Sequence, residues 1–313
     1  MARVDLRSLP DTPALARVVL PDGRARLVLL RSGRLTDLGA AADARLGSLD
    51  RLMEEPLATI RRLLDDDALL ALPSLDPAGL AWAAPVESQE VWGAGITYLR
   101  SREARMEEAI VRDVYALVYE ADRPELFFKA AGWRVVPWGG EIGMRSDSIW
   151  DVPEPELAVL ANSRGEVVAY SPGNDMSSRS IEGENPLYLP QAKVYDSSCS
   201  IGPAAALAWH VALPGRSVRL VIEREGLPVF EGRSSLDDMV RDPADLLRVL
   251  GAAYTLPVGA WMLTGTSIVP PPEFTTRPGD AIRISVEGLG ELRNTVRLVQ
   301  HSGATALSRV RRV

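Results

Sequence analysis

The segment PEPELAVLANSRGEVVAYSPGND, residues 153–175, is the most informative part of the sequence for the fold. Apolar residues fill both halves around the turn-forming Asn-Ser-Arg-Gly at 162–165, which predicts a β-hairpin. Glu154 and Glu156 open the first arm, and side chains two residues apart on a strand point to the same face. Asp175 closes the second arm, so the turn returns it to the end where the two glutamates lie. The sequence therefore predicts that three carboxylates converge.

Three converging carboxylates repel one another unless a cation neutralises them. Because the cluster contains no histidine or cysteine, its hard oxygen ligands suit Mg²⁺, with Mn²⁺ or Ca²⁺ as substitutes. The spacing alone also allows a plainer interpretation, a solvated strand edge followed by a turn aspartate, since Glu-x-Glu is common. Prolines on both sides of Glu154 stiffen the chain and favour the metal-site interpretation.

Strand-like segments continue through the chain after residue 90. They are VWGAGITYL (91–99), ELFFKAAG (125–132), SVRLVIEREGLPVFEG (217–232) and AIRISVEGLGELRNTVRLV (281–299). Two helices are predicted among them, one over 101–121 with Ser101 as N-cap and one over 242–256 with Pro243 in its first turn. This order predicts a β-rich α+β fold. It lacks the strand–helix alternation of a dinucleotide-binding domain, and no Walker loop is present.

The first 85 residues have a different character. Residues 16–39 read as a strand pair around the turn Pro-Asp-Gly, and leucines at helical spacing over 43–67 predict an amphipathic helix or two. The proline-rich segment 68–90 follows. We therefore predict a small N-terminal α/β domain over 1–85 and a catalytic metal-binding domain over 86–313.

Composition and charge exclude several classes of protein. The formal charge of −7 argues against nucleic acid or an anionic membrane as a partner. The single cysteine, Cys199, permits no internal disulfide and no thiolate zinc site. No apolar run approaches the roughly 18 residues of a membrane span, and the first residues lack a signal-peptide core. These observations predict a soluble cytoplasmic protein.

Lysine is rare in this chain. Of the 35 basic residues, only Lys129 and Lys193 are lysine, and both have apolar or small neighbours, which favours burial. A buried ammonium has a pKa that its surroundings can shift, so it can move protons where a guanidinium cannot. The alternative is that two lysines survive by chance. If the segment around Lys193 is a strand, Gln191 shares its face.

Other polar residues near these segments are candidates for contact with a substrate. Arg179 and Ser180 follow the hairpin, and the tight loop at Thr266 could hold a carboxylate through backbone N–H groups and hydroxyls. That loop is equally readable as an ordinary turn. The histidines, His210 and His301, lie beside apolar segments and are interpreted as structural.

Taken together, six motifs resemble the fumarylacetoacetate hydrolase superfamily. They are GAGITY, FFK, EPEL, GND followed by SSRSIE, QAKVYDSSCSIGP and LTGT, in the order of that family, from Gly93 to Thr266. The resemblance implies a mixed β-roll that resembles the C-terminal domain of the family, preceded by the small N-terminal domain. It further implies that Glu154, Glu156 and Asp175 bind Mg²⁺, with Lys193 beside them.

One departure from the family pattern points to a subfamily. Hydrolases of the superfamily carry a histidine base three residues after the tyrosine of GITY, where this chain has Ser101. The segment instead resembles the 2-keto-3-deoxy-pentonate dehydratases, which act on acids derived from D-xylonate or D-arabinonate in pentose catabolism. Their product is 2,5-dioxopentanoate, formed by loss of water.

The resemblance assigns roles to further residues. Lys193 and Glu125 would be the catalytic acid and base, in an order that the sequence leaves open. The substrate-binding candidates are Arg179, Ser180, Gln191, Thr266, Lys129 and Ser101. The substrate would be a small 2-keto acid, and relatives are commonly homodimers or homotetramers.

Two alternatives remain at this point. An acylpyruvate hydrolase or oxaloacetate decarboxylase could use the same metal site, because decarboxylation needs only an electron sink. A non-catalytic ligand-binding protein on the same fold is the second alternative, and the intact set of three carboxylates argues against it.

Overall fold

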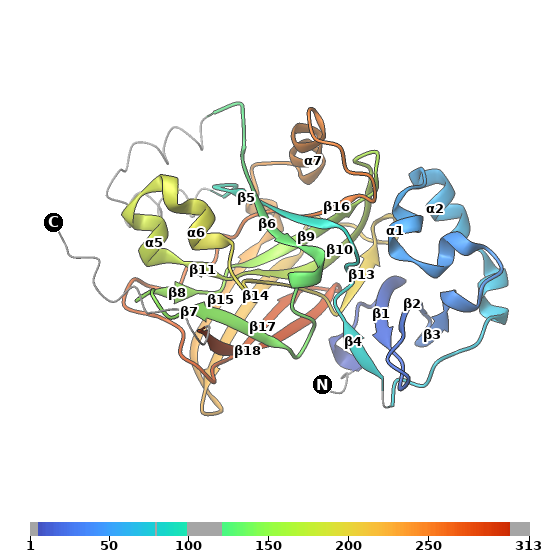
Figure 1. The fold of residues 1–313 in the computed structure, drawn as a ribbon, viewed down its shortest axis with the longest axis horizontal. Helices are drawn as coiled ribbons and strands as arrows, with labels where there is room; N and C mark the ends of the chain where they lie inside the picture. The colour runs from blue at the N-terminus through green and yellow to red at the C-terminus, as the bar shows by residue number, and fades with distance from the viewer. Residues whose placement is uncertain (1–5, 79, 99–120, 301–313) are drawn as a thin grey trace.

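Strands dominate the computed structural model, which describes residues 6–78, 80–98 and 121–300 (Figure 1). Within the described residues, the larger sheet has 11 strands. Its order is β3 (Arg34–Asp37), β2 (Ala25–Arg31), β1 (Ala14–Val19), β13 (Ala204–Leu207), β10 (Val167–Asp175), β9 (Pro155–Ala161), β16 (Ala260–Leu263), β5 (Glu90–Gly95) and β6 (Glu125–Ala131). Two short strands complete it, β12 (Cys199–Ile201) beside β10 and β4 (Ala81–Ala83) beside β1.

A second sheet packs against the first. Its five strands are β15 (Leu227–Ser235), β14 (Ser217–Arg224), β17 (Ala281–Val286), β18 (Gly290–Val299) and β7 (Glu141–Arg145). The short strands β8 (Asp151–Val152) and β11 (Ser177–Ser178) form a separate pair. The described helices are α1 (Leu49–Met53), α2 (Leu57–Leu64), α5 (Arg179–Glu184), α6 (Leu189–Lys193) and α7 (Pro243–Gly251).

The predicted hairpin is confirmed as β9 and β10, which pair antiparallel at the centre of the larger sheet. Its turn closes where Gly165 N donates to Asn162 O at 3.0 Å, and Gly165 has a φ of 74°, which glycine adopts without strain. All of β9 is buried because its two faces serve two cores. Ala158 and Leu160 pack toward the N-terminal helices, and the alternate residues pack toward the second sheet.

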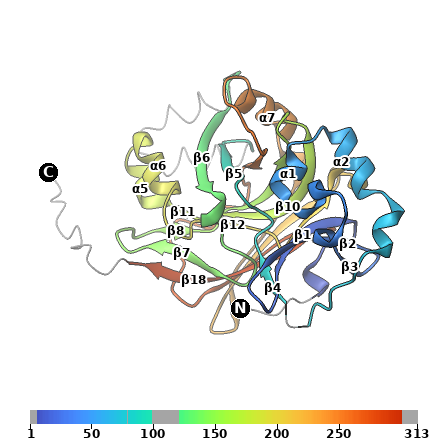
Figure 2. The ribbon, with the colours of Figure 1, turned by 45° about the vertical axis from the view of Figure 1, so that its right-hand side comes forward.

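The N-terminal residues are part of the same sheet. β1 pairs antiparallel with β13, with Ala14 opposite Ala206, and the apolar faces of α1 and α2 share one core with β9. Figures 1 and 2 both show α1 and α2 on one side of the molecule and α5 and α6 on the other. The division into two domains at residue 85 stays a prediction.

Some expected elements differ from the structure. The segment that contains Gln191 and Lys193 is the helix α6, so the expectation of a strand with both side chains on one face is wrong. The helix α7 begins after its N-cap Asp242 as expected but ends at Gly251. The helix expected over 101–121 falls almost entirely outside the described residues.

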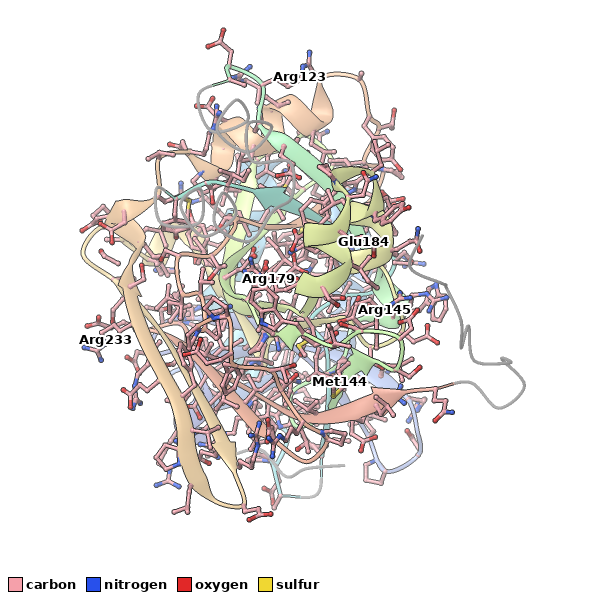
Figure 3. All side chains as sticks on the ribbon, turned by 90° about the vertical axis from the view of Figure 1, so that its left-hand side faces the viewer. Arg123, Met144, Arg145, Arg179, Glu184 and Arg233 are labelled. Carbon is pink, nitrogen blue, oxygen red and sulfur yellow. The ribbon has the colours of Figure 1, made fainter. Side chains whose placement is uncertain are left out.

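Arg179, which begins α5, and Arg145, which ends β7, are both labelled in Figure 3. The Arg179 N–H donates to the Trp150 carbonyl at 2.8 Å, so α5 begins beside the segment that follows β7. Arg145 also connects the end of β7 to α6, because its Nη1 donates to the Gln191 backbone carbonyl at 2.9 Å. Among the described residues, no helix has both the length and the apolar character needed to cross a membrane.

Candidate metal centre and active site

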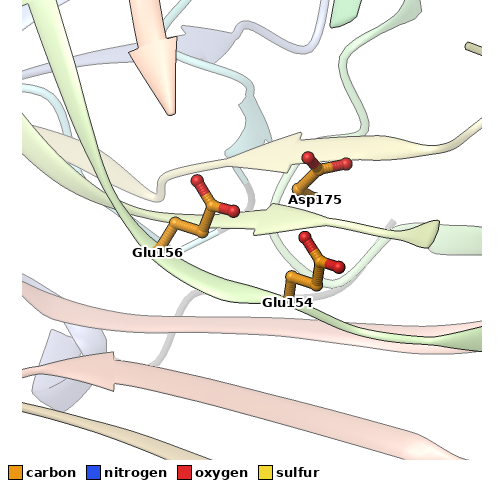
Figure 4. Close-up of side chains that lie close together, drawn as sticks. All are labelled: Glu154, Glu156 and Asp175. Atoms are coloured by element: carbon orange, nitrogen blue, oxygen red, sulfur yellow. The ribbon is translucent and has the colours of Figure 1, made fainter. Parts of the chain in front are cut away.

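The hairpin brings its three acidic residues together, as the sequence predicted (Figure 4). Glu156 lies on β9 opposite Gly173 of β10, and Glu154 lies just before β9. Asp175 ends β10, where its backbone N–H donates to the Glu154 carbonyl at 3.0 Å. One carboxylate oxygen from each residue lies within 4.8 Å of the others, and the residues are 1–3% exposed. The solvated strand edge is therefore excluded.

Positive side chains surround this cluster. Lys193 Nζ donates to Glu154 Oε2 at 2.7 Å, to Asp175 Oδ2 at 3.2 Å and to Ser177 Oγ at 2.7 Å. Arg179 Nη2 pairs with Glu154 Oε1 at 3.0 Å. Both cations are buried and paired with a carboxylate, which limits the cost of removing these charges from water.

The second lysine, Lys129, lies beneath the carboxylates with no exposed surface. Its ammonium pairs with Asp175 Oδ1 and donates to two backbone carbonyls, those of Met176 at 2.9 Å and Lys193 at 2.5 Å. Lys129 is fully buried and is not among the residues that line the adjacent cavity, and the expectation that it contacts substrate stays a prediction.

Glu156 is the carboxylate with the least compensation by side chains. Its Oε2 accepts from the Gly265 N–H at 2.7 Å. Burial, followed by the negative charges of Asp175 and Glu154, raises the pKa of Glu156 well above its usual value. A divalent cation beside these oxygens would offset both effects, so the three residues fit a hard metal such as Mg²⁺ in number, chemistry and burial.

A cavity opens onto the three carboxylates. Charged and polar side chains line it together with apolar ones. The lining residues are Ala94, Gly95, Ile96, Glu125, Phe127, Glu154, Glu156, Asp175, Glu182, Leu189, Lys193, Gly265 and Thr266.

Glycines on β5 give the side chains of β6 their place in the cavity. Gly95 lies opposite Glu125, and a Cβ on Gly95 would come within 2.0 Å of Glu125 Oε2. Gly93 likewise leaves room for the Phe127 ring, because a Cβ on Gly93 would come within 2.4 Å of that ring. Ile96 follows with a φ of 53°, an uncommon conformation for a β-branched residue. The sequence GAGI thus shapes this wall.

The comparisons with known proteins agree with this geometry. The fumarylacetoacetate (FAA) hydrolase C-terminal family matches residues 123–297, which include the hairpin, both lysines and the Thr266 loop. The chain belongs to the fumarylacetoacetate hydrolase family. The β-rich fold with mixed sheets that the sequence predicted is the fold of this family.

Two relatives carry the names of dehydratases. A probable 2-keto-3-deoxyxylonate dehydratase of Haloferax volcanii is 45% identical over 285 residues, covering 88% of this chain and 97% of the relative. The 2-dehydro-3-deoxy-D-arabinonate dehydratase of Saccharolobus solfataricus is 35% identical over 263 residues, covering 79% of this chain and 88% of the relative.

Solved structures that resemble this chain include dehydratases of the same kind of acid. A 2-keto-3-deoxy-D-arabinonate dehydratase complexed with magnesium and 2,5-dioxopentanoate superposes with a TM-score of 0.76 at 30% identity. The match covers 92% of this chain and all of that chain. A hexagonal crystal form of 2-keto-3-deoxyarabinonate dehydratase gives a TM-score of 0.78 with the same coverage.

Of the remaining residues predicted to act in catalysis or substrate binding, some line the cavity and others do not. Glu125 and Thr266 line the cavity, whereas Gln191 is exposed on α6 and is not among its lining residues. Ser180 bonds to Ser148 Oγ at 2.9 Å, away from the cavity lining. Ser101 lies outside the described residues.

Among the lining residues that sequence reasoning did not single out are Phe127 and Glu182. Phe127 is two residues after Glu125, and the Lys193 ammonium lies 5.5 Å from the centre of its ring. Glu182 is 5% exposed and lies one helical turn after Arg179, whose Nε approaches Glu182 Oε2 at 4.0 Å. The i, i+3 spacing of the arginine and the glutamate in SSRSIE was the available signal.

Proposed function

We propose that this chain is a Mg²⁺-dependent dehydratase that converts a 2-keto-3-deoxy-pentonate to 2,5-dioxopentanoate. The observation that carries the proposal is the cavity in which three buried carboxylates face Lys193 and share a lining with Glu125. Relatives named as dehydratases of such acids, and a solved neighbour with magnesium and 2,5-dioxopentanoate, support it.

The two substrate names among the relatives describe one compound. D-Xylonate and D-arabinonate differ only at C2 and C3, and these stereocentres disappear when a 2-keto-3-deoxy acid forms. The shared acid keeps the D configuration at C4. The proposed substrate is therefore this single acid, and the stereochemical question for the enzyme is D against L at C4.

Proton transfers define the work of the side chains. When bound, Mg²⁺ supplies a Lewis acid that polarises the 2-keto group and makes the C3 hydrogens more acidic. One member of the pair formed by Lys193 and Glu125 removes a C3 proton, and the other protonates the C4 hydroxyl as it leaves as water. The resulting C3–C4 double bond shifts to C4–C5, and the C5 enol becomes the aldehyde. Thr266 and Arg179 hold polar groups of the substrate or of the site.

The test incubates purified protein and Mg²⁺ with the C4 D-acid and, separately, its L-enantiomer, and measures 2,5-dioxopentanoate. Oxaloacetate and an acylpyruvate are assayed in parallel for pyruvate release. We expect the aldehyde from the D-acid. Pyruvate from the parallel substrates without any aldehyde would replace the dehydratase by the hydrolase or decarboxylase interpretation.

Two substitutions connect this activity to the site. Glu156→Gln removes one metal ligand, so it should abolish Mg²⁺ binding and activity together. Lys193→Met should abolish activity and leave Mg²⁺ binding intact, because the three carboxylates remain. Full activity of Glu156→Gln would contradict the assigned metal site.

We further propose that the enzyme acts in the cytoplasm as a homodimer or homotetramer. Its single cysteine is buried and free, which suits a reducing compartment. Trp133, Ile149 and Leu187 are apolar and 76%, 85% and 83% exposed, as residues at a subunit contact can be in a single chain. Light scattering of the protein as it elutes from a size-exclusion column measures its molar mass and therefore the number of subunits.

A further inference from the structure

The strand β6 contains an irregularity at Lys129. Phe127 and Phe128 lie opposite Gly93 and Trp92 of β5, but the next residue of β5, Val91, lies opposite Ala130. Lys129 is thus an extra residue with no partner on β5, a β-bulge. Bulges are common next to active sites, where they redirect a side chain. Here the redirected side chain runs to the base of the metal centre.

The Lys129 ammonium has three acceptors, one for each of its hydrogens. They are a carboxylate oxygen of Asp175, the Met176 carbonyl at 2.9 Å and the Lys193 carbonyl at 2.5 Å. Both carbonyls are fixed by a second donor. Tyr195 Oη donates to the Met176 carbonyl at 3.2 Å, and Ser198 Oγ donates to the Lys193 carbonyl at 2.9 Å.

The Lys193 carbonyl is at the last residue of α6. Carbonyls in the last turn of a helix lack partners within the helix, and a positive charge there is favourable. Lys129 therefore holds the end of the helix from which the Lys193 side chain extends to Glu154 and Asp175. One ammonium thus contacts a metal ligand and the backbone of the proton-transfer residue.

We propose that Lys129 is a positioning residue that fixes Asp175 and Lys193 relative to each other. The inference rests on the proposed function of the three carboxylates as a metal site. Lys129 does not line the cavity and is fully buried, so it acts through these two residues and not on the substrate. Two of its three acceptors are backbone carbonyls, so its anchorage does not depend on the carboxylate alone.

The geometry also explains why this residue is lysine in a chain rich in arginine. Three acceptors converge on a single nitrogen, which an ammonium satisfies with three N–H groups. A guanidinium spreads its donors over a planar fork and needs more volume. At a fully buried position that volume is not free, because interiors are close-packed.

The first experiment compares Lys129→Met with a matched control, Arg224→Met. Arg224 pairs with Asp280, whose carboxylate is 1% exposed, at 2.8 Å and does not line the cavity. Both variants therefore remove the cation from a buried carboxylate, and both should lower Tm. Only Lys129→Met should weaken Mg²⁺ binding, measured by calorimetry, by about 10- to 100-fold, and lower kcat at saturating Mg²⁺ with a smaller change in KM. Lys129→Arg restores the charge and should recover part of the Mg²⁺ affinity.

The second experiment needs no variant at Lys129. The chain has two lysines, so protein labelled with ¹⁵N-lysine gives two side-chain ammonium signals in NMR, and Lys193→Met assigns them. We expect the Lys129 signal to be protected from exchange with water, both without and with Mg²⁺. The Lys193 signal should change on addition of Mg²⁺, because its ammonium lies against two of the ligands.

Equal losses of Tm with an unchanged Mg²⁺ affinity in both methionine variants would overturn the proposal. If Lys129→Met does not fold, the NMR experiment decides, and rapid exchange of the Lys129 ammonium with water overturns it. Neither Mg²⁺ affinity nor the NMR signals require turnover. Failure of the dehydratase assay would therefore leave this test of Lys129 intact.

Discussion

The cluster of Glu154, Glu156 and Asp175 holds three negative charges in a volume from which water is largely excluded. Lys193, Lys129 and Arg179 supply three positive charges, paired chiefly with Glu154 and Asp175. The Glu156 carboxylate accepts a hydrogen bond from the uncharged backbone N–H of Gly265, at 2.7 Å. This imbalance makes Glu156 the ligand whose charge depends most on a bound cation.

Mg²⁺ should stabilise the protein more strongly as the pH rises. Because the pKa of Glu156 is raised in the folded protein, the protonated side chain stabilises the metal-free fold. This stabilisation is complete below the usual glutamate pKa and is lost as the pH rises through the raised pKa. Mg²⁺ binds the deprotonated carboxylate in the folded protein and thereby raises the free energy of unfolding. The gain in Tm on adding Mg²⁺ should therefore be small near the usual glutamate pKa and grow as the pH rises through the raised pKa of Glu156. A gain independent of pH, or one that persists in Glu156→Gln, would contradict this account.

The acid and the base of the proposed reaction can be told apart by exchange at C3. In D₂O, a variant that lacks the base should neither exchange the C3 hydrogens of the substrate nor release water. A variant that lacks the acid should still exchange them, because only departure of the hydroxyl is blocked. NMR of the substrate with Lys193→Met and with Glu125→Gln measures this. Equal exchange in both variants would remove the pair from proton transfer at C3.

At the scale of elements, β5 and β6 determine how the cavity wall is built. The absence of side chains at Gly93 and Gly95 leaves room for Phe127 and Glu125 on the neighbouring strand. The bulge that follows then turns Lys129 toward the base of the site. A single strand therefore contributes a candidate acid or base, an aromatic wall and a buried cation.

Gly95→Ala should damage activity more than stability. Its methyl group would come within 2.0 Å of Glu125 Oε2, so the carboxylate must move within the cavity. We expect a loss of kcat of at least about tenfold with Mg²⁺ affinity unchanged, since Glu125 is not a metal ligand. Gly251→Ala, where no atom lies within 4 Å of the added methyl group, is the matched control. Equal kcat for the two variants would show that the placement of Glu125 is unimportant.

The limits of sequence reasoning are visible in the same elements. The hairpin could be predicted because its turn and its buried arms are local in the chain, and the acidic residues follow from that pairing. The helical state of Gln191 and Lys193 could not, since α6 has only five residues and is too short to show a helical period. The contact of Lys129 with the metal centre could not be predicted either. It depends on a bulge in the pairing of β5 with β6, and these strands are far apart in the sequence, so no short sequence pattern indicates the bulge.

Across the whole molecule, the first 85 residues and the catalytic part share both hydrogen bonds and core. β1 and β13 pair through Ala14, Leu15 and Ala16, and α1 packs its buried Leu52 into the core that also contains Leu160 of β9. Residues at one end of the sheet thus support the hairpin that carries the metal ligands.

This continuity predicts one cooperative unfolding transition. Leu52→Ala should lower the free energy of unfolding by about 2–5 kcal/mol, as for other buried leucines. The amides of β1 and of β10 should lose protection from hydrogen exchange together in this variant. The measurement is calorimetry combined with hydrogen exchange. Two separate transitions, or loss of protection in β1 alone, would show that the N-terminal residues unfold independently.

The burial of both lysines also has a practical consequence for handling the protein. Lys129 has no exposed surface, and Lys193 is 2% exposed and lines the cavity, so neither lysine amine is presented on the outer surface to a reagent too large to enter the cavity. Bulky amine-directed labels, cross-linkers and immobilisation resins should therefore react poorly at both lysines of the folded protein. Reaction at Lys129, which is fully buried and does not line the cavity, would report that the metal centre has opened, so an amine dye becomes an indicator of the integrity of the site.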